Sequence, residues 1–434
     1  MGLQSSIEER EDVVTLDLLD GERGAAGSQM APVSSITFFT GKAPEKYLRE
    51  RVKAIVAANP WLGGRLVKVD GVKKLVYPKA NNHGDRLFRV LDIKLNQLTN
   101  VSKMQTVASD ALVKKMALMS QDDPVFKTSL VRDYQDPDRK YAIIVSMSHN
   151  VGDGHTFYSI YKMLCQKRKV LSISPKRKQE VIKALEEKVD ADALAYSKSA
   201  SFIIGLLLGL VRKAIFGVSY EVGMHQINKS FIDKEKTRYK EEENREQKFQ
   251  VKEGKSVPSP PFISTNDIVT SWLLRATKPK MGWMAINCRN KIKNCIDSDA
   301  GNYATILMYR PRDFASPSLI RRSVGTFRRA AKPSTVLPGT LETLRGQKIF
   351  VVTNWTTFYG DISLEGSTQE LHFPFIDYSE CVDTIEFGII FKPKKDATAL
   401  LYCGRPGIVE AIKKANEGIL DEIFIEYHSA KSYL

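Results

Sequence analysis

The stretch YAIIVSMSHNVGDGHTFYSIYKML, residues 141–164, decides the fold that we expect for this chain. Its first part, residues 141–147, is apolar and rich in β-branched side chains, which is typical of a strand buried on both faces. Apolar residues then recur at helical spacing, at Phe157, Ile160, Tyr161 and Leu164. Between the two lie Gly152 and Gly154, which favour a tight turn that a ligand can approach closely. The sequence therefore predicts a strand, a tight turn and a helix in succession.

His149 is the residue that this arrangement places at the end of the strand. Strand ends are where α/β sheets hold their ligand clefts, and the ordinary pKa of histidine, about 6.5, suits it to take up a proton near neutral pH. His149 is therefore a candidate general base. A second interpretation stays open, in which His149 is a core or surface histidine and Asp153 only caps the following helix.

The residues from His149 to Gly154 match the motif HxxxDG, with Asp153 at its fifth position. In this the chain resembles the acyltransferases related to chloramphenicol acetyltransferase. That superfamily includes the BAHD acyltransferases, the wax ester synthase/diacylglycerol acyltransferases and the peptide-synthetase condensation domains. The resemblance implies an α/β (α+β) fold of two lobes, each a mixed sheet flanked by helices, with an active-site tunnel between them. It also implies that His149 is the catalytic base, that Asp153 has a structural, turn-shaping role, and that Gly154 belongs to the site.

Two other segments carry the same resemblance. NPWLGGRL, residues 59–66, is similar to the P-x-x-G-R-L segment of the BAHD and wax ester synthase groups. The expected strand at residues 283–287, followed by Arg289, resembles the N-x-R strand of the superfamily. There the aspartate of the motif usually pairs with an arginine, so the resemblance makes Arg289 the candidate partner of Asp153. The alternative for Arg289 is an exposed cation at a strand end.

Residues 349–364 are expected to form a strand, a turn and the start of a second strand. The turn sequence NWTTFYGD is neither the DFGWG of the BAHD enzymes nor the N-x-x-G-P of the wax ester synthase group. A hydroxyl from Thr356 or Thr357 is a candidate donor to the oxyanion, although surface hydroxyls in turns are common. The candidates for binding the co-substrate are Arg289, Asn302 and Trp355.

The length of the chain is sufficient for two domains. We expect an N-terminal acyltransferase lobe at residues 1–165, a crossover or linker at 166–261, and a C-terminal acyltransferase lobe at 262–434.

Three local predictions follow from composition. The glycine-rich residues 21–32 are expected to be flexible. The charged residues 233–257 are expected to be either a solvated helix or a disordered linker. Residues 408–425 are expected to form a helix.

One strongly apolar run, FIIGLLLGLV at residues 202–211, is followed by Arg212 and Lys213. It is too short to span a bilayer, which takes about 20 residues of helix. Two interpretations of residues 202–217 stay open: a helix buried in the protein, or an interfacial helix or hairpin resting in a membrane surface. The two cations and the basic protein around them favour contact with anionic lipid headgroups in the second case.

The formal net charge of +15 and the isoelectric point of about 9.4 indicate attraction to polyanions. Such polyanions include nucleic acid, an anionic membrane surface and a phosphorylated molecule such as coenzyme A. No nucleic-acid-binding motif is present, so we expect no nucleic-acid partner. Five scattered cysteines without CxxC spacing indicate neither a disulfide framework nor a metal site. We expect a monomer inside the cell, in the cytosol or at a cytosolic membrane face, with Gly2 a candidate for N-myristoylation.

The chemistry that the resemblance implies is acyl transfer from a thioester to an alcohol. This reaction needs a base, donors to the oxyanion and exclusion of water. The chain has no GxSxG elbow and no convincing Cys-His nucleophile, which favours direct attack without a covalent intermediate. We therefore expect an O-acyltransferase with no permanently bound cofactor, acyl-CoA as co-substrate and a lipophilic acceptor. Two alternatives are N-acyl transfer to an amine and a non-catalytic, membrane-associated scaffold with the same fold.

Overall fold

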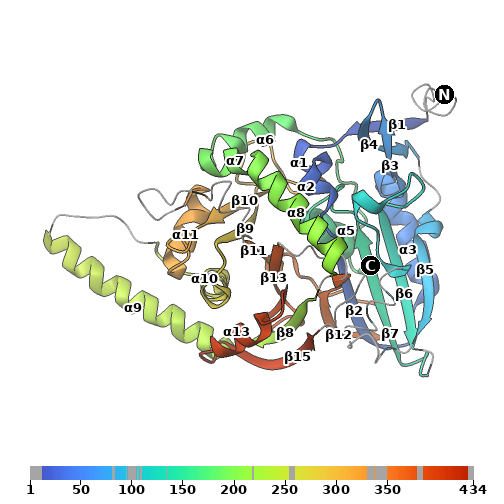
Figure 1. The fold of residues 1–434 in the computed structure, drawn as a ribbon. Coiled ribbons are helices and arrows are strands. Elements are labelled where there is room, and N and C mark those ends of the chain that lie inside the picture. The colour runs from blue at the N-terminus through green and yellow to red at the C-terminus, as the bar shows by residue number, and fades with distance from the viewer. Residues whose placement is uncertain are drawn as a thin grey trace.

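The computed structural model describes residues 12–80, 84–93, 95, 104, 107, 110–133, 135–217, 219–253, 260–329, 337, 349–378 and 385–428. It has two sheet-rich lobes with helices flanking their sheets (Figure 1). This confirms the predicted α/β (α+β) class and the two-lobed arrangement. Gly2, the candidate site of myristoylation, lies outside the described residues.

The first lobe is built on a five-stranded mixed sheet. In spatial order its strands are β12 (Ser367–Pro374), β2 (Val33–Gly41), β7 (Lys140–Met147), β6 (Phe126–Asp133) and β5 (Phe88–Ile93). β7 is the central strand, and residues 141–147 are all buried, as the sequence predicts. Their apolar side chains share one core with α3 (Glu45–Ala58) and α5 (Gly154–Tyr161). The strand, turn and helix expected at residues 141–164 are therefore present.

Smaller elements surround this sheet. They are the three strands β1 (Val13–Asp17), β4 (Val72–Pro78) and β3 (Arg65–Val69), the helices α1 (Asp20–Arg23) and α2 (Ala25–Ser28), and the 3-10 turns η1 (Pro60–Gly63), η2 (Gly84–Leu87), η4 (Met116–Leu118) and η5 (Lys162–Leu164). Helices α1 and α2 replace the flexible segment expected at residues 21–32. The reason is long-range packing, because Glu22 in α1 is fully buried.

The second lobe is built on a seven-stranded mixed sheet. In spatial order its strands are β10 (Ala304–Tyr309), β9 (Met281–Asn287), β11 (Ile349–Asn354), β13 (Ile385–Phe391), β14 (Ala399–Gly404), β8 (Glu221–Ile227) and β15 (Leu420–His428). Helices α10 (Thr265–Thr277) and α13 (Ile408–Lys414) pack on this sheet around a second apolar core, with α11 (Pro317–Thr326) beside α10.

Two strands belong to a different lobe from the one that their sequence segment predicts. β8 comes from the segment 166–261, yet it pairs with β14 and β15 of the second lobe. β12 comes from the segment 262–434, yet it is an edge strand of the first lobe, paired antiparallel with β2. The lobes are therefore joined by exchanged strands as well as by the chain that connects them.

The segment between the lobes carries the helices α6 (Gln179–Glu186), α7 (Ala191–Ser197), α8 (Ala200–Phe216) and α9 (Lys229–Glu253). α9 extends away from the second lobe (Figure 1). Residues 233–253 therefore form a helix, which is one of the two structures expected for the charged segment. α8 contains the apolar run 202–211. Within the described ranges, no single helix has both the length and the apolar character needed to cross a membrane. α7 and residues 200–209 are bent relative to each other, and they reach that length and apolar character only when they are taken together.

The predicted helix at residues 408–425 is wrong in its second half. α13 ends at Lys414, and β15 begins at Leu420. The Asn416 side chain accepts hydrogen bonds from the backbone N–H groups of Gly418 and Leu420, and Gly418 has a φ of +94°, so the chain turns sharply there. Pairing of β15 with β8 then decides the outcome, and this is a long-range contact that local periodicity does not contain.

Candidate active site

His149 lies just beyond β7, in the turn that leads to α5. The residue is partly exposed. Its Nδ1 atom is buried and has no hydrogen-bond partner in the described part of the chain, whereas Nε2 is not among the buried atoms. The ring therefore keeps one nitrogen, Nε2, that is not buried, and a general base needs such an accessible nitrogen.

Gly152 allows this turn to be tight. A Cβ atom at this position would lie 2.6 Å from Cγ2 of Thr156, which is closer than side chains tolerate. Gly154 is different, because a Cβ atom there would make only ordinary contacts, 3.5 Å from Phe358 and 3.6 Å from Nε1 of Trp355. Packing therefore requires glycine at position 152, whereas the space at position 154 would also hold a Cβ atom.

Asp153 is the N-cap of α5 and the centre of a buried hydrogen-bond network. Its Oδ1 atom accepts from the backbone N–H of Thr156 at 3.0 Å, and its Oδ2 atom accepts from the backbone N–H of Tyr303 at 3.0 Å. Oδ2 also lies 2.7 Å from Nη1 of Arg289. Burial alone would raise the pKa of the Asp153 carboxyl, but the charge and hydrogen bond of Arg289 outweigh it and lower the pKa. The pair of Asp153 and Arg289 expected from the sequence is therefore formed.

Arg289 uses all five of its N–H groups inside the protein. Nε donates to the carbonyl of Asp299, Nη1 to Asp153 and Asn287, and Nη2 to Thr156 and the carbonyl of Gly301. Its side chain has no exposure to solvent. No donor remains for a phosphate of coenzyme A, so the expectation that Arg289 binds the co-substrate is corrected: its contacts hold the turn of the motif.

Asn302 also acts on the turn. Its Nδ2 group donates to the carbonyl oxygen of His149 at 2.6 Å and to Oε1 of Glu22 at 3.0 Å. Both amide hydrogens are thus used by the protein. Asn302 therefore connects the second lobe to the backbone of the candidate base.

Sequence reasoning missed the buried pair of Glu22 and Arg177. Nε of Arg177 lies 2.8 Å from Oε2 of Glu22, and neither side chain is more than 4% exposed. The backbone carbonyl of Glu22 also accepts from Nδ2 of Asn150, the residue after His149. No local motif marks Glu22, since its role depends on contacts with residues far along the chain.

The oxyanion candidates lie in η6 (Thr356–Phe358), which contacts α5. Oγ1 of Thr356 donates to Oδ1 of Asn354 at 2.7 Å, so an oxyanion would have to compete with that bond. Thr357 is exposed. Trp355 is buried, with its ring centroid 5.8 Å from that of Tyr158 in α5. The turn from the second lobe therefore covers the helix that follows His149.

Behind α5 lies a buried histidine that the sequence does not single out. Nε2 of His372, in β12, is 2.8 Å from the hydroxyl of Tyr158. Its Nδ1 atom is 2.9 Å from Oγ1 of Thr37 and 3.2 Å from the hydroxyl of Tyr161. Burial lowers the pKa of His372 to about 3, so its ring is neutral near pH 7. This network joins β12, β2 and α5.

We expect His372 to make stability depend on pH. Its pKa is about 6.5 in the unfolded chain and about 3 in the folded protein, so the unfolded chain binds more protons between these values. The stability that the neutral His372 ring contributes is complete above pH 6.5 and is lost as the pH falls toward 3. In urea unfolding below pH 6.5, the free energy of unfolding of His372→Gln should fall less steeply than that of wild type, by about 1.4 kcal/mol per pH unit. Equal slopes in the two proteins would contradict this.

We also expect Asn302→Ala to impair the candidate base through its backbone. Loss of the bond to the His149 carbonyl lets the turn shift, and a displacement of roughly 1 Å costs about a hundredfold in rate. Thiol release from acyl-CoA is the measurement. Asn416→Ala removes comparable side-chain bonds to the backbone far from the motif and is the control. A normal rate in Asn302→Ala would show that the bond does not position His149.

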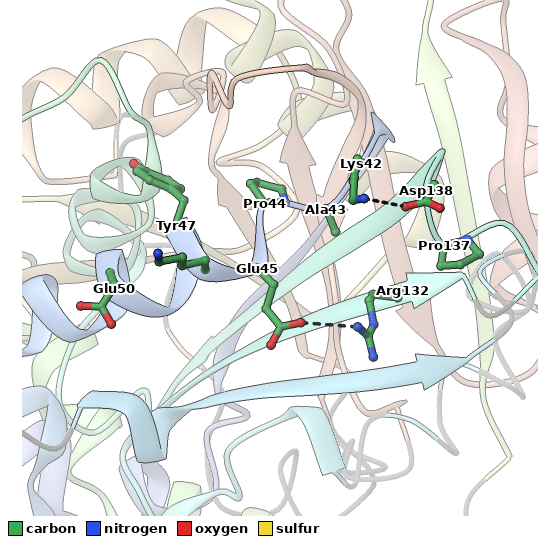
Figure 2. Close-up of a pocket in the computed structure, with 10 residues that line it drawn as sticks. Lys42, Ala43, Pro44, Glu45, Tyr47, Glu50, Arg132, Pro137 and Asp138 are labelled. Carbon is green, nitrogen blue, oxygen red and sulfur yellow. Dashed lines mark hydrogen bonds and ion pairs between the residues drawn. The ribbon is translucent and has the colours of Figure 1, made fainter.

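A surface hollow of about 740 Å³ is lined by residues that follow β2 and residues that precede β7 (Figure 2). Because β2 pairs antiparallel with β7, the hollow lies near the start of β7, whereas His149 follows its end. Its lining includes Lys42, Glu45, Arg132 and Asp138. Lys42 pairs with Asp138 at 3.3 Å, and Arg132 pairs with Glu45 at 3.4 Å. None of the candidate site residues lines this hollow.

No protein-family model matches the sequence. No curated protein matches it either. Among solved structures, the chain is similar to TRI101 of F. sporotrichioides complexed with coenzyme A and T-2, with 12% identity, a TM-score of 0.58, and coverage of 95% of this chain and 99% of that one. It is also similar to the first condensation domain of the calcium-dependent antibiotic synthetase, with 11% identity, a TM-score of 0.55, and coverage of 93% and 94%.

A third similar structure is polyketide synthase associated protein 5 from Mycobacterium tuberculosis, with 12% identity and a TM-score of 0.54. The match covers 89% of this chain and 94% of that one. At these identities the likeness shows the fold alone. The chain has the two-lobed, chloramphenicol acetyltransferase-like fold that condensation domains share.

Proposed function

We propose that this protein is an acyl-CoA-dependent O-acyltransferase with His149 as its general base. The observation that carries the proposal is the placement of His149: it follows a strand end, its Nε2 atom is not buried, and its backbone carbonyl accepts a hydrogen bond from Asn302. The buried ion pair of Asp153 and Arg289 also stabilises the turn of the motif. The likeness in fold to a structure complexed with coenzyme A supports the choice of co-substrate.

In the proposed reaction, His149 takes the proton of the acceptor hydroxyl as the oxygen attacks the carbonyl carbon of the thioester. The carbon–sulfur bond then breaks, and protonated His149 returns the proton to the departing thiolate. The products are an ester and free coenzyme A, and no residue is acylated. Thr356 and Thr357 remain our candidates for donors to the oxyanion, with Trp355 covering the co-substrate.

The two substrates would enter a tunnel between the lobes from opposite faces and meet at His149. The net charge of +15 supports binding of the phosphates of coenzyme A. We further propose that the acceptor is a lipophilic alcohol, that the protein is a monomer on the cytosolic side, and that it contacts a membrane peripherally.

The test is release of free thiol by purified protein, with acyl-CoAs of increasing chain length and a panel of lipophilic alcohols. Mass spectrometry of the product separates transfer from hydrolysis. Ester formation is the expected result. Products formed only when amines replace the alcohols would indicate N-acyl transfer instead. A protein that releases no thiol with any pair of substrates would be the non-catalytic scaffold.

A further inference from the structure

The outward face of α8 is made of large aliphatic side chains. Six of them are between 40% and 61% exposed: Ile203, Ile204, Leu207, Leu208, Val211 and Ile215. Their spacing places all six within one side of the helix, because residues three, four and seven apart share a face. α8 runs along the near side of the molecule in Figure 1. A continuous apolar surface of this kind marks a contact with something other than water.

Three other residues among the described side chains of α8 are less exposed. Phe202 and Gly209 are buried, and Gly205 is partly buried. A surface helix of a globular protein normally has the opposite distribution, with its large apolar residues inward. The exposure of the six aliphatic side chains therefore favours the interfacial interpretation of residues 202–217 over that of a buried helix.

We propose that α8 lies in the plane of an anionic phospholipid bilayer, with this face at the boundary of headgroups and acyl chains. Its 17 residues span about 25 Å and include Arg212 and Lys213, so the helix is too short and too polar at one end to cross a bilayer but can lie in its surface. The net charge of +15 complements anionic headgroups, and the same charge opposes pairing of α8 with a second copy of the chain.

The position of α8 connects this surface to the candidate site. α8 contacts α2, and the carbonyl of Gly27 in α2 accepts from Nδ2 of Asn150, the residue after His149. Only α8 itself and the short helix α2 thus lie between such a bilayer and the motif turn. This inference rests on the proposed function when it names the acceptor, which is a membrane lipid whose hydroxyl lies at headgroup depth.

The test uses the full chain and vesicles of phosphatidylcholine with or without phosphatidylserine, in a sedimentation assay. Wild type should pellet with the anionic vesicles and less with the neutral ones. The triple variant Leu207→Glu, Val211→Glu and Ile215→Glu should lose at least about tenfold in binding, since it removes apolar contact and adds repulsion. A triple serine variant at the same positions adds no charge. It should lose less vesicle binding than the glutamate variant, but the loss should still be measurable.

The matched control places glutamate at three equally exposed aliphatic positions outside α8. These are Leu171, Ile296 and Ile423, which are between 49% and 59% exposed. This control carries the same added charge and should keep most of the binding. Thermal unfolding of each variant shows that it is folded.

The proposal is overturned if wild type does not pellet with anionic vesicles, or if the α8 variants bind as wild type does. A dimer in light scattering that the α8 variants dissolve would assign the face to a second copy. Vesicle binding needs neither substrate nor catalysis, so His149→Ala should bind normally. Docking can therefore stand if the proposed reaction fails, and the reverse is also true.

Discussion

In a His149→Ala variant, the rate of thiol release from acyl-CoA in the presence of an alcohol falls by roughly a factor of 10² to 10⁴. The reason is that the acceptor hydroxyl then has no group to take its proton, while binding of both substrates is preserved. The measurement is a comparison of kcat/KM between wild type and variant at saturating alcohol. A loss in kcat with little change in KM is expected, because the base acts in the transition state.

His155 is the matched control for this experiment. It lies in the first turn of α5, with Nε2 3.3 Å from Oδ1 of Asp297. Burial lowers its pKa, since the charged ring is poorly solvated there. His155→Ala should therefore change the rate by much less than His149→Ala. Equal losses in the two variants would show that the effect comes from damage to α5 and not from removal of a base.

The sequence predicts the central part of the first lobe well. β7 is apolar throughout, so its burial on both faces can be read from residues 141–147. Asp153 follows a glycine and precedes an apolar helical pattern, so its role as N-cap can be inferred locally. Its pairing with Arg289, by contrast, is a contact between residues far apart in the sequence. It is accessible before the structure only through resemblance to a family.

The parts that sequence reasoning missed all depend on long-range contacts. Glu22 stands in a glycine-rich segment whose composition indicates flexibility, yet Arg177 and Asn302 bury its carboxylate. β12 reads as part of the second lobe, and only its pairing with β2 places it in the first. His372 in that strand has no motif around it, although it joins β12 to α5 through Tyr158 and to β2 through Thr37.

The outward face of α8 shows another limit of reading by pattern. A run of apolar residues predicts burial but does not say in what. In α8, Phe202 and Gly209 are buried, whereas six large aliphatic side chains are at least 40% exposed. Both interpretations of residues 202–217 are consistent with composition, and the exposure of individual side chains, which the sequence does not give, favours the second.

The second large effect is expected from Arg289→Ala. Removal of this guanidinium leaves the carboxylate of Asp153, itself only 5% exposed, without its charged partner. Breaking a buried ion pair on one side costs about 3–5 kcal/mol, and here the bonds to Gly301 and Asp299 are lost as well. Urea unfolding should report a loss of that size. Lys198→Ala, which breaks an exposed pair with Glu186, is the control and should cost about 0–1 kcal/mol.

Activity separates the two roles that Arg289 can have. If it only holds the turn, Asp153→Asn combined with Arg289→Met removes both charges together and should recover part of the lost stability. Thiol release by the folded fraction of this double variant should then recover as well, because His149 and Asn302 are unchanged. A double variant that is stable but inactive would show that the buried charges act on the reaction itself. In that case the field of the ion pair, and not only the shape of the turn, would belong to the catalytic apparatus.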